Sequence, residues 1–345
     1  MANGTSQSAI TVGTGTGAVV GGRGDDILLA EPQVMTATFT PVNGSGISGT
    51  VRVTLDGETL RVQADVTGLE ANQAHAMHIH GLSDAAGTPL DTLPLTSSVD
   101  ADRDGFVELG EAQKVAGPVL LDLGSPVAPA DGHVTVDKSF ALADLPAGTL
   151  DTLLPLDFRS VEVHGLSVRA GEGAGTSGEV DGSAGYKATL PVGTAPLHGQ
   201  DASATNVGAT DTATAAAQST AGVRLVGGDG ADRLIGGHGD DILVGGRGDD
   251  ILAGGQGDDD LVGGAGADHF LVGQGKDVIT DFNAAQGDRL TFSHDDPSAA
   301  LVLHNTAQGT WVIQGTGAIE DPATQGVLLL GIHVSSPADA AEWFS

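Results

Sequence analysis

The side chains best placed for chemistry are aspartates that return every nine residues in the second half of the chain. From Gly227 the sequence reads GGDGADRLI, GGHGDDILV, GGRGDDILA, GGQGDDDLV and GGAGADHFL, followed by the degraded unit VGQGKDVIT. The sixth position of every unit is aspartate, and the eighth is leucine, isoleucine or phenylalanine. The aspartates are Asp232, Asp241, Asp250, Asp259, Asp268 and Asp277. An apolar residue at a fixed place in each unit favours a stacked repeat fold over a disordered acidic tract.

Each nine-residue unit is expected to make half a coil, with a glycine-rich turn and a short strand. Stacking brings the aspartates of neighbouring coils together, and residues 227–281 hold 12 Asp against three basic residues. These columns repel one another unless a cation joins them. Calcium, with roughly six to eight oxygen ligands, suits carboxylates and turn carbonyls better than magnesium does. The turn glycines expected to line the sites are Gly227, Gly236, Gly245, Gly254 and Gly263.

The repeats resemble the calcium-binding nonapeptides of RTX (hemolysin-type) proteins over residues 223–281. The resemblance implies a parallel β-roll that folds on calcium binding after export by a type I secretion apparatus. It also implies that residues 282–345 form a C-terminal cap and an uncleaved secretion signal. Alternatively, this last segment only caps the roll. One isolated copy, GGRGDDILL at residues 21–29, lies within residues 1–32, which we interpret as a flexible lead-in.

A second acidic motif, at residues 100–111, has the spacing of an EF-hand calcium loop. Asp100, Asp102, Asp104, Glu108 and Glu111 fall at loop positions 1, 3, 5, 9 and 12, while Gly105 falls at 6 and Phe106 at 7. The carboxylates and the Phe106 carbonyl would bind the ion. Pro94 disfavours a helix before the loop, so we expect a module inserted between strands rather than a paired calcium sensor. The alternative is an acidic loop without an ion.

Three histidines are candidate ligands of a different kind. His78 and His80 flank Ile79, so in a β-strand both imidazoles would lie on one face, about 7 Å apart. His164, in the strand-like segment 160–168, is the natural third ligand from a neighbouring strand. Imidazole suits copper, zinc or nickel. Alternatively, all three are packed or hydrogen-bonded structural residues.

The histidine segments resemble the CHRD (chordin-type) domain, whose bacterial members carry comparable His-x-His-Gly and Val-His-Gly strands. They are more distantly similar to the Greek-key barrel of copper/zinc superoxide dismutases, which implies copper at His78, His80 and His164. No histidine between residues 81 and 133 matches the dismutase's bridging and zinc ligands, and its cysteines are missing. Lys187 stands near the place of its active-site arginine and is a less directional anion guide. A copper-dependent, dismutase-like oxidoreductase is therefore the alternative function.

The elements that must position these residues are β-strands. Residues 50–55 and 60–66 alternate apolar and polar side chains around Asp56-Gly57, which is a strong hairpin signal. With the strand-like segments 74–80, 133–136, 160–168 and 186–192, the pattern predicts a Greek-key sandwich over residues 33–195. An Ala/Thr/Ser-rich linker, residues 196–222, precedes the roll. The predicted fold class is all-β.

The composition restricts the function further. The 345 residues carry a net charge of −31, which disfavours nucleic acid and anionic lipid as partners. The chain has no cysteine, no apolar run near the roughly 18–20 residues of a membrane span and no recognisable N-terminal export signal. It also lacks the motifs of serine hydrolases, zinc proteases and nucleotide-binding loops. We therefore expect a secreted, non-enzymatic calcium-binding protein, extracellular or in a surface matrix, whose extracellular or cell-surface partner is unknown.

Overall fold

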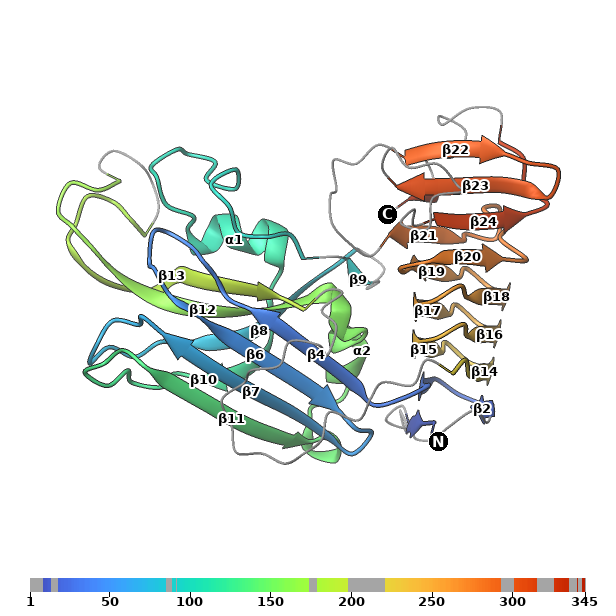
Figure 1. Ribbon diagram of the computed structural model, residues 1–345, viewed down its shortest axis with the longest axis horizontal. Coiled ribbons are helices and arrows are strands. Elements are labelled where there is room, and N and C mark those ends of the chain that lie inside the picture. Colours follow the sequence, from blue (N-terminus) through green and yellow to red (C-terminus); the bar gives the residue numbers. More distant parts are fainter. Residues whose placement is uncertain are drawn as a thin grey trace, which may run out of the picture. The chain divides into compact units, whose positions relative to one another are not determined.

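The computed structural model describes residues 9–13, 18–84, 89–90, 92–173, 179–197, 221–292, 301–314, 326–334, 340 and 343–344. The chain divides into two compact units (Figure 1). We call residues 34–55 and 59–214 the sheet unit, and residues 1–33, 56–58 and 215–345 the roll unit. Most of the expected linker, residues 198–220, lies outside the described residues.

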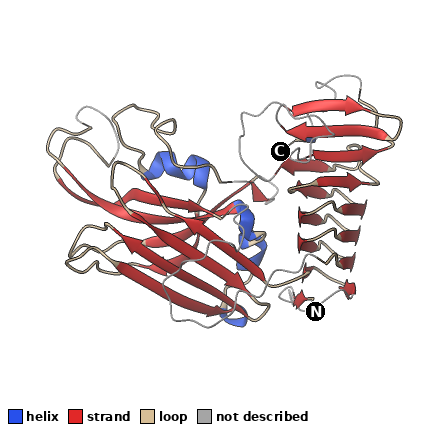
Figure 2. Cartoon of the chain, in the orientation of Figure 1, coloured by secondary structure: helices blue, strands red, loops and turns tan. Residues whose placement is uncertain are grey.

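The sheet unit contains two antiparallel sheets and little helix (Figure 2). The first sheet has the order β11-β7-β6-β4 and is formed by β4 (Gln33–Thr38), β6 (Ser48–Leu55), β7 (Thr59–Thr67) and β11 (Val134–Ala141). The second has the order β10-β8-β12-β13-β5, with β9 beside β8, and is formed by β5 (Thr40–Pro41), β8 (Met77–Ser83), β9 (Pro89–Leu90), β10 (Val119–Gly124), β12 (Arg159–Val168) and β13 (Gly185–Pro196). The helices are α1 (Leu109–Ala116) and α2 (Thr149–Leu153), with 3-10 turns η1 (Leu142–Asp144) and η2 (Leu156–Phe158).

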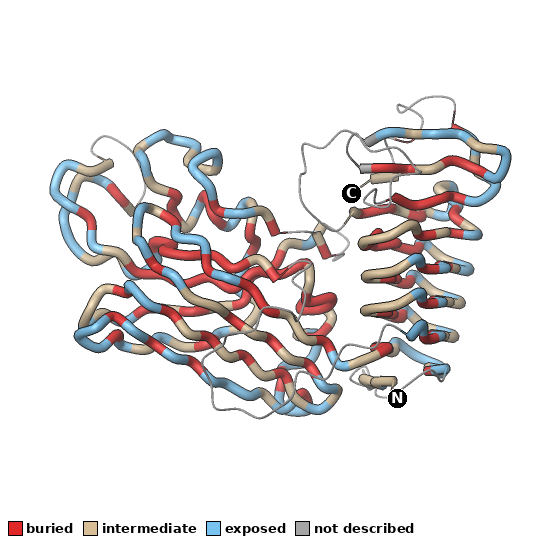
Figure 3. The backbone as a smooth tube through the Cα atoms, viewed as in Figure 1, coloured by how far each residue is buried: buried red, intermediate tan, exposed pale blue. Residues whose placement is uncertain are grey.

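The alternation of apolar and polar residues in the sequence explains why these segments form strands with one buried face. Along β7 the apolar residues are buried and the polar residues between them are partly exposed. Figure 3 shows by colour how burial changes from residue to residue along the strands. The predicted β6–β7 hairpin is confirmed, with Leu55 opposite Leu60. Its turn is closed by Asp56, whose carboxylate accepts the Glu58 amide hydrogen at 3.0 Å.

The second sheet is buried on both faces at its centre. Met77, Ile79, Val161 and Val163 are fully buried and lie on one face of β8 and β12. The opposite face carries polar residues that are also buried: His80, Ser160, Glu162, His164 and Thr194. Helix α1 contacts β8 and β13. Burying a polar group without a hydrogen bond or a metal ion costs free energy. The polar side chains on this face therefore need partners of one of these two kinds.

The roll unit is built from two sheets of mostly parallel strands. One has the order β1-β3-β15-β17-β19-β21 and the other β2-β14-β16-β18-β20-β24-β23-β22. The strands are β1 (Ala9–Val12), β2 (Ala18–Val20), β3 (Asp26–Leu29), β14 (Arg224–Asp229), β15 (Arg233–His238), β16 (Ile242–Arg247), β17 (Ile251–Gln256), β18 (Asp260–Ala265), β19 (His269–Val272), β20 (Lys276–Ile279), β21 (Arg289–Phe292), β22 (Leu301–Asn305), β23 (Gly309–Gln314) and β24 (Gly326–Leu330).

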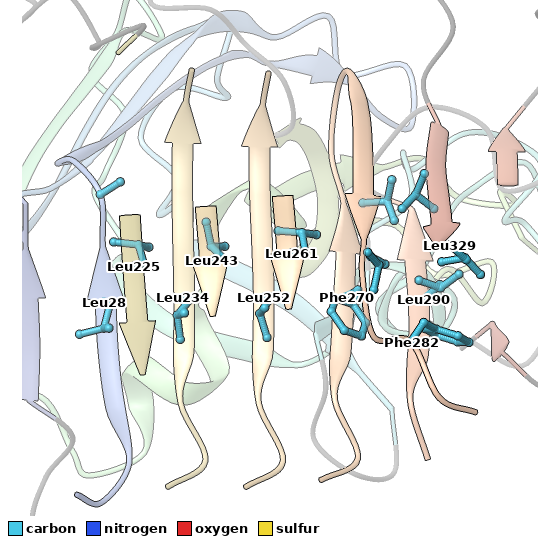
Figure 4. Packing of buried hydrophobic residues seen from close by; sticks show 14 of the residues in the cluster. Leu28, Leu225, Leu234, Leu243, Leu252, Leu261, Phe270, Phe282, Leu290 and Leu329 are labelled. Carbon is cyan, nitrogen blue, oxygen red and sulfur yellow. The ribbon is translucent and has the colours of Figure 1, made fainter. Parts of the chain in front are cut away.

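The eighth residues of the repeat form the core of the roll. In one sheet Leu225, Leu243 and Leu261 stack in register, and in the other Leu234, Leu252 and Phe270 do so (Figure 4). All six are fully buried. Each residue pairs with the one 18 positions later, so two nine-residue units make one coil, as the repeat predicts.

The structure differs from the sequence-based expectation at the N-terminal end of the roll. We interpreted residues 1–32 as a flexible lead-in, but β1, β2 and β3 lie in the two roll sheets. Their apolar residues Val19 and Leu28 are buried in the same core as Leu225 and Leu234. At the other end β24 joins β20 in parallel, and β23 and β22 follow in antiparallel order. The residues outside the described ranges include much of the remaining predicted secretion signal.

No helix among the described residues is long and apolar enough to cross a membrane.

Candidate metal centres

The repeat aspartates form two ladders of buried side chains. In each ladder the Oδ1 atom of one aspartate accepts the backbone amide hydrogen of its equivalent one coil earlier. Asp250 accepts from Asp232 at 2.8 Å and Asp268 from Asp250 at 3.0 Å, while Asp259 accepts from Asp241 at 2.8 Å and Asp277 from Asp259 at 3.2 Å. Because each carboxylate is held through one oxygen, the direction of the other oxygen is fixed.

The second oxygen, Oδ2, is buried without a hydrogen-bond partner in all six repeat aspartates: Asp232, Asp241, Asp250, Asp259, Asp268 and Asp277. In the five units that begin with glycine, Oδ2 lies beside that first glycine, and in three of them it also lies near a carbonyl oxygen of the next coil. A Cβ atom added to Gly245 would lie 2.3 Å from Asp250 Oδ2 and 2.7 Å from the Gly263 carbonyl oxygen. Gly227 and Gly236 have the same two kinds of neighbour, and Gly254 and Gly263 lie against Asp259 and Asp268. The space that glycine leaves is thus lined by oxygen atoms, which suits calcium.

Burial makes the ionised form of these aspartates unfavourable. Burial, together with a smaller contribution from neighbouring carboxylates, raises the pKa of Asp241 and Asp268 to about 6 and that of Asp250 and Asp259 to about 7. The pKa of Asp277 lies well above its ordinary value for the same reasons. Near neutral pH the metal-free roll must therefore either take up protons or bury unpaired charge.

The raised pKa values predict that protonation of the aspartates at low pH stabilises the metal-free roll and so partly replaces calcium. A raised pKa in the folded state means that folding binds protons, so the metal-free roll loses stability as pH rises from about 4 to about 7. In buffer freed of divalent ions we expect more hydrogen-exchange protection in residues 224–279 at pH 5 than at pH 8. With saturating calcium the order reverses, because protons compete for the same carboxylates. Equal protection at both pH values without calcium would contradict the prediction.

Two ladder members escaped the sequence analysis. Asp26, in the isolated N-terminal copy, donates its amide hydrogen to Asp232 Oδ1 at 2.8 Å and so precedes Asp232 in the same ladder. Asp288 is buried and accepts the Asp268 amide hydrogen at 3.1 Å. It follows Asp268 by 20 residues instead of 18, so it lies outside the strict period. The only sequence signal for Asp288 is the Gly-Asp pair that precedes β21.

The EF-hand-like loop brings its first three predicted ligands together. One carboxylate oxygen each from Asp100, Asp102 and Asp104 lie within 4.8 Å of one another. Asp100 accepts the amide hydrogens of Asp104 and Gly105 at 3.2 and 2.9 Å, and Gly105 has a φ of 95°, which glycine adopts without strain. Burial and the adjacent carboxylates raise the pKa of Asp104. The loop thus gathers negative charge at one point.

The remaining loop carboxylates hold the chain around this point. Glu111 accepts the amide hydrogens of Ala101 at 2.6 Å and of Glu108 at 3.1 Å. With Glu108 at its N-cap, α1 begins through a reciprocal capping box. The Glu108 carboxylate also accepts the Val180 amide hydrogen at 2.6 Å. No helix occurs among the described residues 92–99, in agreement with the effect expected of Pro94.

The three predicted histidines meet on the buried polar face of the second sheet. One ring nitrogen from each of His78, His80 and His164 lies within 4.8 Å of the others, and the ring centroids are 5.3–5.8 Å apart. His78 and His80 come from β8 and His164 from β12. Two register shifts in the pairing of β12 with β13 flank His164, one on each side.

Backbone carbonyls fix the tautomers of two rings. His80 Nδ1 lies 3.0 Å from the Gly117 oxygen, and His164 Nδ1 lies 2.9 Å from the Thr189 oxygen. A carbonyl can only accept, so Nδ1 carries the hydrogen and Nε2 of the neutral ring presents its lone pair. Burial lowers the pKa of both histidines to about 4, which keeps the rings neutral. Both Nε2 atoms are buried without a hydrogen-bond partner, as is His78 Nδ1.

A fourth residue that the sequence analysis missed, Glu162, faces these nitrogens. Its Oε2 lies 3.7 Å from both His80 Nε2 and His164 Nε2, and its carboxyl is fully buried with neither oxygen hydrogen-bonded. A distance of 3.7 Å is too long for a hydrogen bond but compatible with two ligands bound to one ion at about 2.0–2.1 Å each. Burial raises the pKa of Glu162 to about 8. The sequence did contain a signal for Glu162, because residues two positions apart in a β-strand lie on the same face and Glu162 is two positions before His164.

Comparisons with known proteins identify the repeats of the roll unit. Two overlapping segments, residues 224–252 and 244–279, match the family described as RTX calcium-binding nonapeptide repeat (4 copies). The roll unit therefore carries RTX calcium-binding repeats in a parallel β-roll, which supports calcium as their metal. Curated proteins gave no match. Among solved structures, a SOD-like protein from Bacillus subtilis is 16% identical, covers 47% of this chain and 97% of its own, and has a TM-score of 0.24.

Proposed function

We propose that this chain is a secreted calcium-binding protein whose roll folds on calcium binding after type I export. The observation that carries the proposal is the set of six buried Oδ2 atoms without partners, each fixed in direction through its Oδ1. Wherever calcium is scarce these atoms oppose folding. At free calcium about 100 times Kd, each independent site would add about 2.7 kcal/mol. Several coupled sites are enough to decide whether the roll folds.

Limited proteolysis of the full chain tests this proposal. In millimolar calcium, residues 224–279 should resist cleavage, and in chelator they should be cut first. Magnesium at the same concentration is the control for ionic strength and charge, and it should protect poorly because its octahedral geometry is stricter. Equal resistance in calcium and chelator would contradict calcium-dependent folding.

For the sheet unit we propose a Greek-key sandwich of CHRD type with a non-enzymatic, extracellular or surface-matrix role. The arrangement of its antiparallel strands and the burial of one apolar face in each sheet support the sandwich. Its partner would be an extracellular or cell-surface molecule. A binding screen against extracellular matrix and cell-wall material tests this role, and the absence of any binding would remove its basis.

The EF-hand-like loop would bind one further calcium ion and fix the long connection between β8 and β10. The convergence of Asp100, Asp102 and Asp104 supports this assignment. We predict that the double substitution Asp100→Asn/Asp104→Asn removes one calcium ion and speeds proteolysis within residues 92–118 several-fold. The exposed Asp144→Asn is the control for loss of charge. Unchanged calcium content and cleavage would show that the loop is only acidic.

A transition-metal site is the second candidate function. Five buried atoms without partners, from His78, His80, His164 and Glu162, converge there, and three neutral imidazoles with one carboxylate fit divalent zinc or copper. Zinc would be structural, whereas copper would add redox chemistry of a dismutase kind. Lys187 lies 3.5 Å from Asp181 Oδ1 and 3.0 Å from Ser183 Oγ, so it is already engaged as an ion-pair partner.

Metal analysis separates the two candidates. Stoichiometric copper that is lost in His78→Ala, together with superoxide dismutation, would favour the oxidoreductase. Zinc without activity would favour a structural site. Calcium alone, after dialysis against zinc and copper, would leave the histidines as structural residues.

A further inference from the structure

The isolated N-terminal copy of the repeat is separated from the others by almost two hundred residues of sequence, yet it pairs with the roll in the register of the repeat. Residues 18–20 of β2 lie beside 224–226 of β14, and residues 27–29 of β3 lie beside 233–235 of β15. Arg23 in the turn between them pairs in parallel with Asp229. The pairing thus extends along both strands and the turn.

Backbone hydrogen bonds and the core continue through this junction. Gly21 and Gly24 donate their amide hydrogens to Val226 and Asp229 at 2.8 and 2.7 Å, and Ala30 donates to Ile235 at 2.9 Å. Val19, Leu28 and Ala30 are buried with the repeat leucines, and Figure 4 shows Leu28 in line with Leu234 and Leu252. A segment that buries apolar side chains in a preformed ladder gains stability only while docked.

The polar edge of this coil resembles the other rungs, except that Asp26 is only half-buried and its Oδ2 also accepts the Gly22 amide hydrogen at 2.8 Å. Asp26 donates its amide hydrogen to Asp232 Oδ1, as Asp232 does to Asp250. A Cβ atom on Gly21 would lie 2.7 Å from Asp26 Oδ2 and 2.5 Å from the Gly227 carbonyl oxygen, which parallels the surroundings of Gly245. The buried, unpartnered Oδ2 of Asp232 lies against the same Gly227.

From these contacts we propose that residues 18–31 form a full coil of the roll, next to the terminal strand β1, and complete an additional calcium site with Asp26 Oδ2 and the Gly227 carbonyl. The repeat-family match begins only at residue 224 and does not include this coil. In the sequence, residues 34–214 lie between the two segments that form the roll. When the N-terminal coil docks, these residues therefore become one long loop of the chain with both ends held in the roll. Calcium would then hold both ends of that loop. The inference rests on the proposed calcium-dependent folding of the roll.

Two engineered cysteine pairs test the docking, because the natural chain has no cysteine that could compete. Arg23→Cys/Asp229→Cys joins the N-terminal coil to β14, and Asp229→Cys/Arg247→Cys joins two repeats within the roll. Residues paired on neighbouring strands lie about 4.8 Å apart, within the range that a disulfide tolerates. Each full-length variant is incubated with oxidised glutathione in calcium or in chelator, and disulfide formation is followed by non-reducing electrophoresis.

We expect both pairs to oxidise about tenfold faster in calcium, because docking replaces a loose tether by fixed neighbours. If only the repeat pair responds to calcium, the N-terminal coil does not dock and this inference is overturned while the proposed function stands. If neither pair responds, calcium-dependent folding itself fails.

The calcium count tests the ligand separately. Native mass spectrometry should find one ion fewer in Asp26→Asn than in the natural chain, and no change in the exposed control Asp144→Asn. An unchanged count in Asp26→Asn would remove Asp26 from the site.

Discussion

Alanine at Gly245 should expel one calcium ion from the middle of the roll and lower its calcium-bound stability by about 3 kcal/mol, the contribution of one site at calcium about 100 times Kd. The added Cβ would lie 2.3 Å from Asp250 Oδ2 and 2.7 Å from the Gly263 oxygen, where we place the ion. Gly245 does not have a positive φ, so the backbone itself tolerates alanine. The clash with the Gly263 backbone oxygen also acts in the metal-free roll, so the contribution of the metal site is the loss of stability in calcium beyond the loss in chelator.

Denaturant unfolding of the full chain in calcium and in chelator measures the effect of Gly245→Ala, with native mass spectrometry for the ion count. The matched control is Gly22→Ala, where an added Cβ meets no atom within 4 Å and φ is also not positive. This control should keep its calcium and its stability. A full calcium count in Gly245→Ala would place the ion elsewhere.

Glutamine at Glu162 should have opposite effects on the metal-free and metal-bound protein. In the metal-free fold the pKa of Glu162 is about 8 against an ordinary value of 4.5, so folding binds a proton between these pH values. The natural residue therefore destabilises the metal-free sheet unit by about 3 kcal/mol at pH 7, relative to acid pH. Glutamine does not ionise and removes this term.

The same Glu162→Gln substitution removes the anionic ligand, so zinc affinity should fall by at least about tenfold, or 1.4 kcal/mol. Thermal unfolding in chelator at pH 5 and pH 8, together with zinc titration calorimetry, measures both effects. Glu58→Gln, at an exposed turn, is the control for charge. Higher stability without weaker zinc binding would make Glu162 a buried acid and not a ligand.

The sequence was most informative where one physical rule repeats. The period of nine predicted the coils, the apolar core and the columns of aspartates, because the same residue types return at the same positions of every unit from Gly227. That these aspartates are buried is seen only in the structure. The same rule applied to residues 21–29, but the partner of that copy is about two hundred residues away. Nothing local indicates pairing at such a separation, so this coil was missed.

The candidate transition-metal site was also only partly predictable. Alternation around Ile79 placed His78 and His80 on one face, and His164 joined them as expected. The tautomers depend on the carbonyls of Gly117 and Thr189, which are distant in sequence and are set by tertiary structure alone. Helix α1 was not predicted, although Glu108 and Glu111 carry the spacing of a capping box.

Circular dichroism of the full chain during a calcium titration, starting from metal-free protein at pH 7.5 with magnesium as the reference, tests the central claim most directly. The claim is that the buried aspartate oxygens prevent the roll from folding until calcium binds them. It predicts a cooperative gain of β signal that calcium produces and an equal concentration of magnesium does not. A metal-free spectrum that already has its full β signal and does not change with calcium would contradict it.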